Sequence, residues 1–293
     1  MTLRVLAAGL RATVQDRGRP GAARIGVPHG GPADPFAFRA AAALAGTDVA
    51  IEVYGPPFSF VVGDARVVAC AGRDVTVRVG GRRVPGWMAA LARPGEEVTV
   101  RGPRVAYVAV SGGIAVAPVL GSRSAYLPAS IGPRALAAGD ELPLGDGPLA
   151  ADRAGARIPP PDYARDVAAI PGPHAARFPD ADAFFGSEWR VSEASDRMGT
   201  RLEGPPLAGA DAELITCGVV AGAVQVPRGG SPIVLGPDHQ TTGGYPVVAT
   251  VATADLGVVA QRLPGEALRF FAVDAAGAVV RLASAEASLA AIA

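Results

Sequence analysis

Glycine and proline interrupt this chain at short intervals along its whole length. The sequence has 38 Gly and 27 Pro in 293 residues, spread out instead of gathered in one tract. Between them lie apolar or alternating runs of about four to eight residues, long enough for a β-strand but too short for most helices. Glycine and proline also supply the backbone conformations of tight turns. The pattern predicts a mainly β fold with a few short helices and disfavours an all-helical one.

The predicted strands fall in both halves of the sequence. They are 58–62, 67–71, 75–79, 98–100 and 105–110 in the first half, and 189–191, 213–215, 223–226, 233–235, 247–251 and 268–273 in the second. One early stretch differs, because Asp34 can cap a helix, Pro35 suits its first turn and an alanine-rich run continues to Leu44. We predict a helix at 35–44 and a short helical turn at 180–185.

The length of the chain allows two packed domains. Three consecutive prolines, Pro159 to Pro161, stand among scattered charges near the middle of the sequence. Such a composition is typical of a semi-rigid connector. The sequence therefore predicts an N-terminal domain at 1–147, a proline-rich connector at 148–166 and a C-terminal domain at 167–293.

The balance of charge excludes several classes of partner. The 27 basic and 27 acidic side chains are interspersed and give a net charge of zero, so the chain has no field to attract nucleic acid or an anionic membrane. We expect no signal peptide in the N-terminal residues, and no apolar run is long enough to span a membrane. We expect a cytoplasmic protein that binds neither nucleic acid nor membrane.

Missing and dispersed residue types limit the chemistry further. The chain has no Lys, so it cannot form a Schiff base or carry biotin, which is attached through a lysine amine. His29, His174 and His239 are far apart in sequence, and Cys70 and Cys217 lack the spacing of a metal or redox motif. We predict no metal site and two buried, reduced cysteines. No nucleophile elbow, Walker motif or dinucleotide fingerprint supports a self-sufficient hydrolase, kinase or dehydrogenase.

The densest group of polar side chains follows a predicted strand, at residues 238–246. The segment reads Asp-His-Gln-Thr-Thr-Gly-Gly-Tyr-Pro. Asp238 can act as a general base, Gln240 and the threonines can bind an amide or carboxylate, and the two glycines let backbone N–H groups approach a ligand. The alternative is a polar turn that satisfies its own hydrogen bonds. The number of side-chain donors favours a ligand site.

Glutamine is scarce, which makes its positions informative. The chain has four, at Gln15, Gln225, Gln240 and Gln261. A carboxamide both donates and accepts, so it suits a neutral amide ligand such as a lactam or urea. For each glutamine taken alone, an internal hydrogen bond to the backbone is the alternative.

Several arginines stand next to glycine, serine or aspartate and are further candidates. Arg19 and Arg123 can each bind a carboxylate or phosphate through two parallel hydrogen bonds. For Arg17 and Arg197 we favour an ion pair with the aspartate that precedes each, fixing a turn. Arg19 and Arg123 are therefore our candidates for substrate binding.

Segments along nearly the whole chain resemble one known family. The segments are Gln15-Asp16-x-Gly18-Arg19, Gly26-Val27-Pro28, Gly121-Ser122-Arg123-Ser124, Ser195-Asp196-Arg197-Met198-Gly199, Gln225-Val226-Pro227 and the loop from Asp238 to Pro246. The most specific piece is Thr-Thr-Gly-Gly-Tyr-Pro. The chain resembles the biotin-dependent carboxyltransferase A/B family, which includes allophanate hydrolase subunit 2 and the C-type 5-oxoprolinase subunits. It departs from the usual family pattern at Gly30, where members have Ser, and at Ala125, where they have Thr.

The resemblance implies two cyclophilin-like β-barrel domains with a ligand site between them, in a complex with a B-type and an A-type subunit. In that complex 5-oxo-L-proline is opened to L-glutamate at the expense of ATP, which this chain shares or a partner binds. On this interpretation the chain is a hydrolase subunit that is inactive alone. The expected catalytic residues are Asp238, Gln240 and Gln225, and the expected substrate-binding residues are Arg19, Arg123, Thr242, Gly243, Gly244 and Tyr245.

Two other functions remain open. In the urea-carboxylating relatives, the same fold takes a carboxyl group from biotin carried elsewhere, which agrees with the absence of Lys here. A third possibility is a regulatory protein that binds the B-type subunit without turnover. The three hypotheses differ in the partners they require.

Overall fold

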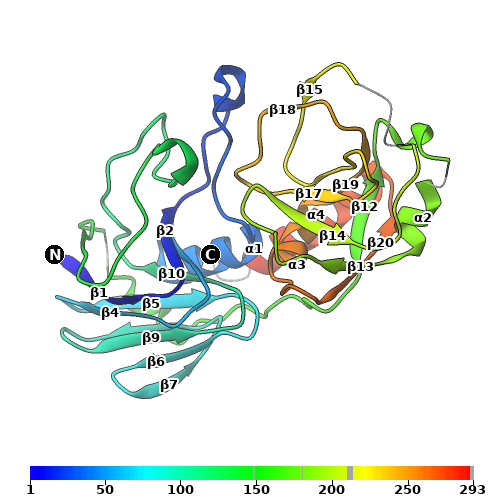
Figure 1. Cartoon of the computed structure of the whole chain (residues 1–293). Coiled ribbons are helices and arrows are strands. Elements are labelled where there is room, and N and C mark those ends of the chain that lie inside the picture. The colour runs from blue at the N-terminus through cyan, green and yellow to red at the C-terminus, as the bar shows by residue number, and fades with distance from the viewer. Residues whose placement is uncertain (148, 180, 210–213, 291–293) are drawn as a thin grey trace. The chain divides into compact units, whose positions relative to one another are not determined.

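The computed structural model describes residues 1–147, 149–179, 181–209 and 214–290. The chain forms two compact units, both drawn in Figure 1. The N-terminal unit comprises Met1–Arg19, Gly30–Pro161 and the residues from Ala287 onward, and the C-terminal unit comprises Pro20–His29 and Asp162–Glu286. The division after Pro161 falls inside the predicted connector 148–166, whose first residue lies outside the described ranges.

The N-terminal unit is built on two antiparallel sheets. The six-stranded sheet has the order β11-β1-β4-β9-β6-β7, and the five-stranded sheet has the order β2-β3-β10-β5-β8. Their strands are β1 (Thr2–Ala8), β2 (Arg11–Gln15), β3 (Ala50–Tyr54), β4 (Phe58–Val62), β5 (Arg66–Ala71), β6 (Thr76–Val79), β7 (Arg82–Pro85), β8 (Ala89–Ala92), β9 (Glu97–Arg101), β10 (Val105–Val110) and β11 (Glu141–Pro143).

Helix α1 (Pro35–Ala45) lies against the five-stranded sheet, mainly at β5 and β10. The Asp34 side chain caps its first turn by accepting from the backbone N–H of Ala37 at 3.0 Å. The helix ends at Gly46, whose left-handed conformation (φ 68°) lets its N–H reach the last carbonyls. The helix predicted at 35–44 is confirmed.

The C-terminal unit is a closed barrel with the strand order β12-β19-β16-β17-β14-β13-β20. Only its β12–β20 pair is parallel among the described strands. The strands are β12 (Val167–Pro171), β13 (Glu188–Val191), β14 (Gly199–Glu203), β16 (Ala223–Gln225), β17 (Ile233–Leu235), β19 (Val247–Val251) and β20 (Ala267–Ala272). Closure pairs every barrel strand on both sides, which removes exposed strand edges.

Shorter elements surround the barrel. A separate two-stranded ribbon joins β15 (Cys217–Gly218) to β18 (Thr242–Gly243), and Figure 1 shows the two side by side, apart from the barrel strands. The helices are α2 (Ala181–Gly186), α3 (Leu256–Ala260) and α4 (Ala275–Ala290), and the 3-10 turns of the whole chain are η1 (Ala22–Ile25), η2 (Leu127–Ala129), η3 (Ala151–Arg153), η4 (Ala175–Arg177) and η5 (Thr253–Asp255). None of the described helices is both long and apolar enough to cross a bilayer.

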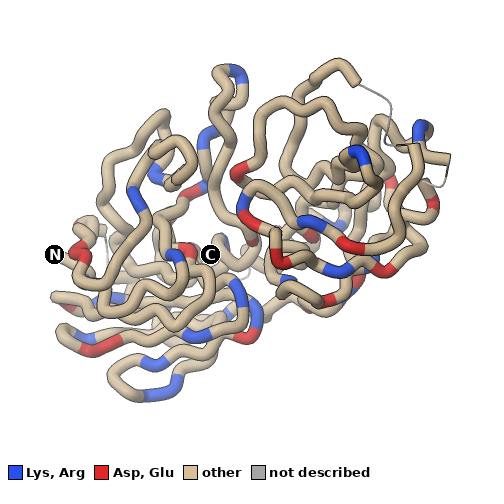
Figure 2. The backbone as a smooth tube through the Cα atoms, in the orientation of Figure 1, with Lys and Arg blue, Asp and Glu red and all other residues tan. Residues whose placement is uncertain are grey.

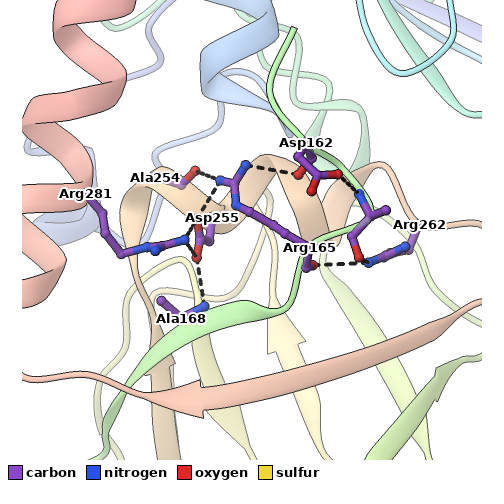
Figure 3. A network of polar contacts seen from close by, with 8 residues as sticks. Asp162, Arg165, Ala168, Ala254, Asp255, Arg262 and Arg281 are labelled. Carbon is purple, nitrogen blue, oxygen red and sulfur yellow. Dashed lines mark hydrogen bonds and ion pairs between the residues drawn. The ribbon is translucent and has the colours of Figure 1, made fainter.

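A buried carboxylate ties α4 to the barrel (Figure 3). Asp255 is fully buried, and its side chain accepts from the backbone N–H of Ala168 at 2.7 Å, at the start of β12. Arg165 and Arg281 pair with the same carboxylate at 2.6 and 2.8 Å. The network offsets the cost of burying the charge of Asp255, because each oxygen has charged or backbone donors.

The prediction of a mainly β fold is confirmed, and so are the strands at 58–62, 105–110, 233–235 and 247–251. The prediction of a strand at 213–215 is wrong for Leu214 and Ile215, since the strand begins at Cys217, while residue 213 lies outside the described ranges. The helical turn predicted at 180–185 corresponds to α2, although residue 180 also lies outside them. Figure 2 shows basic and acidic residues mixed along both units, as the composition suggests.

Candidate functional site

The loop 238–246 is held by the barrel of the C-terminal unit. Strand β17 ends at Leu235 just before the loop, and β19 begins at Val247 directly after it. In its middle the loop forms β18, which pairs with β15 in the separate ribbon. The loop is therefore fixed at both ends and in the middle, although only two of its residues lie in a strand.

Two of the predicted site residues, Gln225 and Gln240, meet through their side-chain amides. Gln225 is the last residue of β16 and is 2% exposed, and its Oε1 accepts from Nε2 of Gln240 at 3.0 Å. The other end of the Gln225 amide, Nε2, is buried and has no hydrogen-bond partner among the described residues. An unpaired buried donor costs about 1–3 kcal/mol. The arrangement thus presents one unused amide donor.

Gly243 explains how the loop approaches this pair so closely. A Cβ at position 243 would lie 2.5 Å from Nε2 of Gln225 and 3.5 Å from Nε2 of Gln240. The first distance is shorter than any allowed contact, so a side chain at this position would displace the Gln225 amide. The structure therefore brings together Gln225, Gln240 and Gly243, which the sequence analysis named as candidates, and their roles stay predictions.

Asp238 forms a buried ion pair with Arg197. The Arg197 guanidinium donates from Nε at 2.7 Å and from Nη2 at 2.9 Å to the two oxygens of the carboxylate. We expected Arg197 to pair with the adjacent Asp196, whose Oδ1 instead accepts the backbone N–H of Met198 at 2.9 Å. The catalytic role of Asp238 stays a prediction, and a role as general base requires its carboxylate to act while bound to Arg197.

His239 is buried in the same loop and was not selected from the sequence. Its Nδ1 lies 2.5 Å from the backbone carbonyl oxygen of Gln240, an arrangement that favours the tautomer with the proton on Nδ1. Burial lowers the pKa of His239 below its ordinary value, and the neighbouring His29 acts in the same direction, against the Gln240 carbonyl and Asp238, which raise it. The imidazole is therefore neutral at pH 7.

The remaining exposed part of the loop carries the other predicted contacts. Thr242 is exposed, Gly244 is half-buried and the Tyr245 side chain is 48% exposed. A Cβ at Gly244 would meet Thr216 Oγ1 and the Leu214 carbonyl at ordinary distances. Their roles in substrate binding stay predictions.

A second polar cluster lies in the N-terminal unit around Asp16. Its Oδ1 accepts from Oγ of Ser122 at 2.5 Å and from Oγ of Ser124 at 2.7 Å, and also from the backbone N–H of Gly18 at 2.9 Å. Oδ2 accepts the backbone N–H of Arg123 at 2.6 Å. Burial raises the pKa of Asp16, but these hydrogen bonds, led by that of Ser122, outweigh it and hold the pKa below the ordinary value.

Arg19 and Arg123 bind backbone carbonyls near this cluster. Arg19 is fully buried, with Nε 3.3 Å from the Val119 carbonyl and Nη2 bonded to the Ser124 carbonyl. Arg123 is partly buried and donates from Nε to the carbonyl of Val116 at 3.1 Å. These bonds hold the 116–124 segment in place, and substrate binding by either arginine stays a prediction.

Sequence reasoning did not bring Asp16, Ser122 and Ser124 together as one cluster, and it misjudged one cysteine. Asp16, Ser122 and Ser124 form its centre, and the paired serines on either side of Arg123 were the available signal. The expectation of two buried cysteines is wrong, since Cys70 is buried but Cys217 is exposed on the ribbon.

Comparison with known families decides the identity of the fold. The profile described as "Carboxyltransferase domain, subdomain A and B" matches residues 25–272. The chain belongs to this carboxyltransferase family. The resemblance seen in the sequence motifs is thereby confirmed.

Two curated members of the carboxyltransferase family are similar to the chain. The C-type 5-oxoprolinase subunit of Escherichia coli (strain K12) is 36% identical over 285 residues, which cover 92% of this chain and 90% of that protein. A putative urea carboxylase of Emericella nidulans is 29% identical over 303 residues, covering 92% of this chain but only 24% of that protein.

A solved structure shows that the family likeness extends to the fold. The crystal structure of the K. lactis urea amidolyase matches with a TM-score of 0.90 and 27% identity, covering 100% of this chain and 20% of that one. The chain therefore corresponds to one part of a much longer polypeptide in that protein.

Proposed function

We propose that the chain is the C-type subunit of an ATP-dependent 5-oxoprolinase, which opens 5-oxo-L-proline to L-glutamate together with an A-type and a B-type subunit. The observation that carries the proposal is the similarity to the C-type 5-oxoprolinase subunit of E. coli, which extends over 90% of that protein. A relative named as a subunit implies a multi-subunit assembly. The chain then supplies one part of a hydrolase acting on a cyclic amide.

The carboxamide pair formed by the side chains of Gln225 and Gln240 supports a lactam as the ligand. Because Oε1 of Gln225 already accepts from Gln240, the unused group of the pair is the Nε2 donor. A donor is complementary to a carbonyl or carboxylate oxygen, both of which 5-oxoproline carries. A hydrogen bond to the lactam carbonyl withdraws electron density from the amide and stabilises the oxyanion that develops when the ring opens.

ATP is assigned to the partner subunits. The chain has no Lys for a phosphate-binding loop. Two of its buried arginines are engaged, Arg19 with backbone carbonyls and Arg197 with Asp238. Arg19 and Arg197 are therefore engaged elsewhere, and we assign the binding of ATP to a partner subunit.

A second candidate is a carboxyltransferase that acts on urea or another small amide. The Emericella nidulans relative and the K. lactis urea amidolyase favour it, because they carry regions similar to 92% and 100% of this chain, respectively. Without Lys the chain would need carboxybiotin borne on a partner. The same Nε2 donor of Gln225 would then bind the carbonyl oxygen of urea.

The test is glutamate release from 5-oxoproline with the chain and its A- and B-type partners purified, each omitted in turn. Turnover that needs all three chains supports the proposal, and Gln225→Ala should lower it at least about tenfold. Turnover that persists without this chain overturns it. Biotin-dependent carboxylation of urea in place of glutamate release would favour the second candidate, and tight binding of the B-type subunit without turnover would favour a regulatory role.

A further inference from the structure

The exposed Cys217 stands directly across the ribbon from Gly243. The two residues are register partners in the antiparallel β15–β18 pair. Directly opposed residues of such a pair project their side chains to the same face, with Cβ atoms about 4.5–5.5 Å apart. The Cβ direction of Gly243 points at Nε2 of Gln225, 2.5 Å away. The Cys217 side chain therefore projects to the face of the ribbon on which the carboxamide pair lies.

An independent feature marks this face as a place for a ligand. Gln225 is 2% exposed, and its Nε2 has no hydrogen-bond partner within the described part of the chain. A buried amide donor with no partner in the protein is available to an ordered water, an ion or a ligand. The unused donor and the thiol are thus neighbours across Gly243.

The two cysteines of the chain differ sharply in accessibility. Cys70 lies inside β5 and is 1% exposed, and burial raises the pKa of its thiol to about 12. Cys217 is exposed. Because the thiolate is the attacking species in disulfide exchange and must reach its partner, reaction is expected at Cys217 alone.

We propose that Cys217 is a site of thiol–disulfide exchange beside the carboxamide pair of Gln225 and Gln240. A small disulfide bonded to Cys217 would occupy the space in which the ligand of that pair binds. The Cys217 thiolate attacks one sulfur of the disulfide R–S–S–R, the S–S bond of the reagent breaks, and Cys217–S–S–R forms. R–S⁻ leaves as the thiolate, and the proton that Cys217 released passes to the solvent buffer. The inference uses the proposed function only for the identity of the ligand.

The small number of side-chain amides in the chain allows changes around Gln225 and Gln240 to be followed directly by NMR. The sequence has four Gln and no Asn, so a ¹⁵N-correlated spectrum contains four side-chain carboxamide NH₂ pairs. Gln225→Glu and Gln240→Glu each remove one pair and assign it. The reagent is 5,5′-dithiobis(2-nitrobenzoate), whose coloured leaving thiolate counts the cysteines that react, and Cys217→Ser is the matched control.

The expected result is one equivalent of leaving thiolate, with the Gln225 and Gln240 signals shifted and those of Gln15 and Gln261 unchanged. Dithiothreitol should restore the original spectrum, and Cys217→Ser should neither react nor shift. Absence of reaction, release from Cys70 as well, or a shift of no carboxamide or of all four overturns the inference.

A second titration separates this inference from the proposed function. Adding 5-oxoproline to the unmodified chain should shift the same two signals, and the mixed disulfide should abolish that response. If the mixed disulfide at Cys217 shifts both signals but 5-oxoproline shifts neither, the carboxamide pair does not bind the lactam, and the proposed exchange site at Cys217 stands. If 5-oxoproline shifts the Gln225 and Gln240 signals both before and after Cys217 is modified, the ligand proposal stands. The proposal that a disulfide at Cys217 takes the place of the ligand then fails.

Discussion

Arg197 and Asp238 are bonded through two contacts of 2.7 and 2.9 Å although they lie 41 positions apart in the chain. Both side chains are 5% exposed. Removing one partner of such a pair leaves the other charge buried and uncompensated, whereas replacing both with apolar groups is often tolerated. The pair therefore joins the turn before β14 to the start of the candidate loop.

Substitution of either member alone should destabilise the C-terminal unit. We expect Asp238→Ala to lower the free energy of unfolding by about 3–5 kcal/mol, measured by urea denaturation. The double variant Arg197→Met with Asp238→Leu should recover most of that loss. If Asp238 also acts on substrate, the double variant will be stable and inactive; a single Asp238→Ala variant of native stability would contradict the structural role.

The close approach at Gly243 can be tested with one methyl group. In Gly243→Ala the new Cβ would lie 2.5 Å from Gln225 Nε2, so the amide must move. We expect turnover in the reconstituted complex to fall about tenfold or more, with a stability change within about 1 kcal/mol because the Gln225 side chain can yield.

Gly218→Ala is the matched control for that variant. Gly218 lies in the same ribbon, and a Cβ there would meet nothing within 4 Å. Turnover should therefore be unchanged. Equal losses in both variants would mean that the ribbon as a whole, and not the Gln225 contact, limits activity.

The hydrogen bonds to Asp16 predict a particular response to acid. Because they hold its folded-state pKa below 3.8, the carboxylate stabilises the fold above that pH, and the stabilisation is lost as the pH falls through the lowered pKa. The free energy of unfolding of the native chain should fall as the pH drops from about 5 down through the lowered pKa of Asp16. Asp16→Asn should be less stable at pH 7 and should lose part of this slope.

The exposed Asp48 provides the comparison for Asp16. Asp48→Asn should leave both the stability at neutral pH and the acid dependence close to those of the native chain. An acid response identical in all three proteins would show that the Asp16 cluster does not contribute to it.

The anchoring of α4 by Asp255 is also open to measurement. Arg281→Ala removes the helix's contribution to the network but leaves Arg165 on the carboxylate. We expect a loss of about 1–2 kcal/mol and faster amide hydrogen exchange along α4. Arg269→Ala removes an exposed ion pair with Glu188 and should change neither quantity. Unchanged exchange in Arg281→Ala would show that the helix is held by other contacts.

The local sequence pattern was sufficient to predict those strands whose side chains are buried on both faces of a sheet. The runs at β4, β10, β17 and β19 are almost wholly apolar, so their length and flanking turns identified them. Strand β14 carries Thr, Arg and Glu, and its place in the barrel depends on pairing with β17, which no local pattern encodes. Helix α4 escaped notice because its alanine and serine residues provide little apolar contrast between its faces.

The candidate site shows the same limit. Scarcity drew attention to Gln225, scarcity and the polar loop together drew attention to Gln240, and the structure places their amides in contact. The contacts of Arg197 with Asp238 and of the two serines with Asp16 could not be predicted from the sequence, because the chain brings these residues together from 41 and from 106 or more positions away.

The C-terminal unit is assembled from two stretches of sequence, since Pro20–His29 groups with Asp162–Glu286. No single cut can therefore separate the units into fragments that are each complete. During synthesis the early stretch leaves the ribosome more than a hundred residues before the barrel that it joins. A fragment that begins at Asp162 would therefore lack the Pro20–His29 stretch of the C-terminal unit, and a fragment that ends at Pro161 would carry that stretch without the rest of its unit.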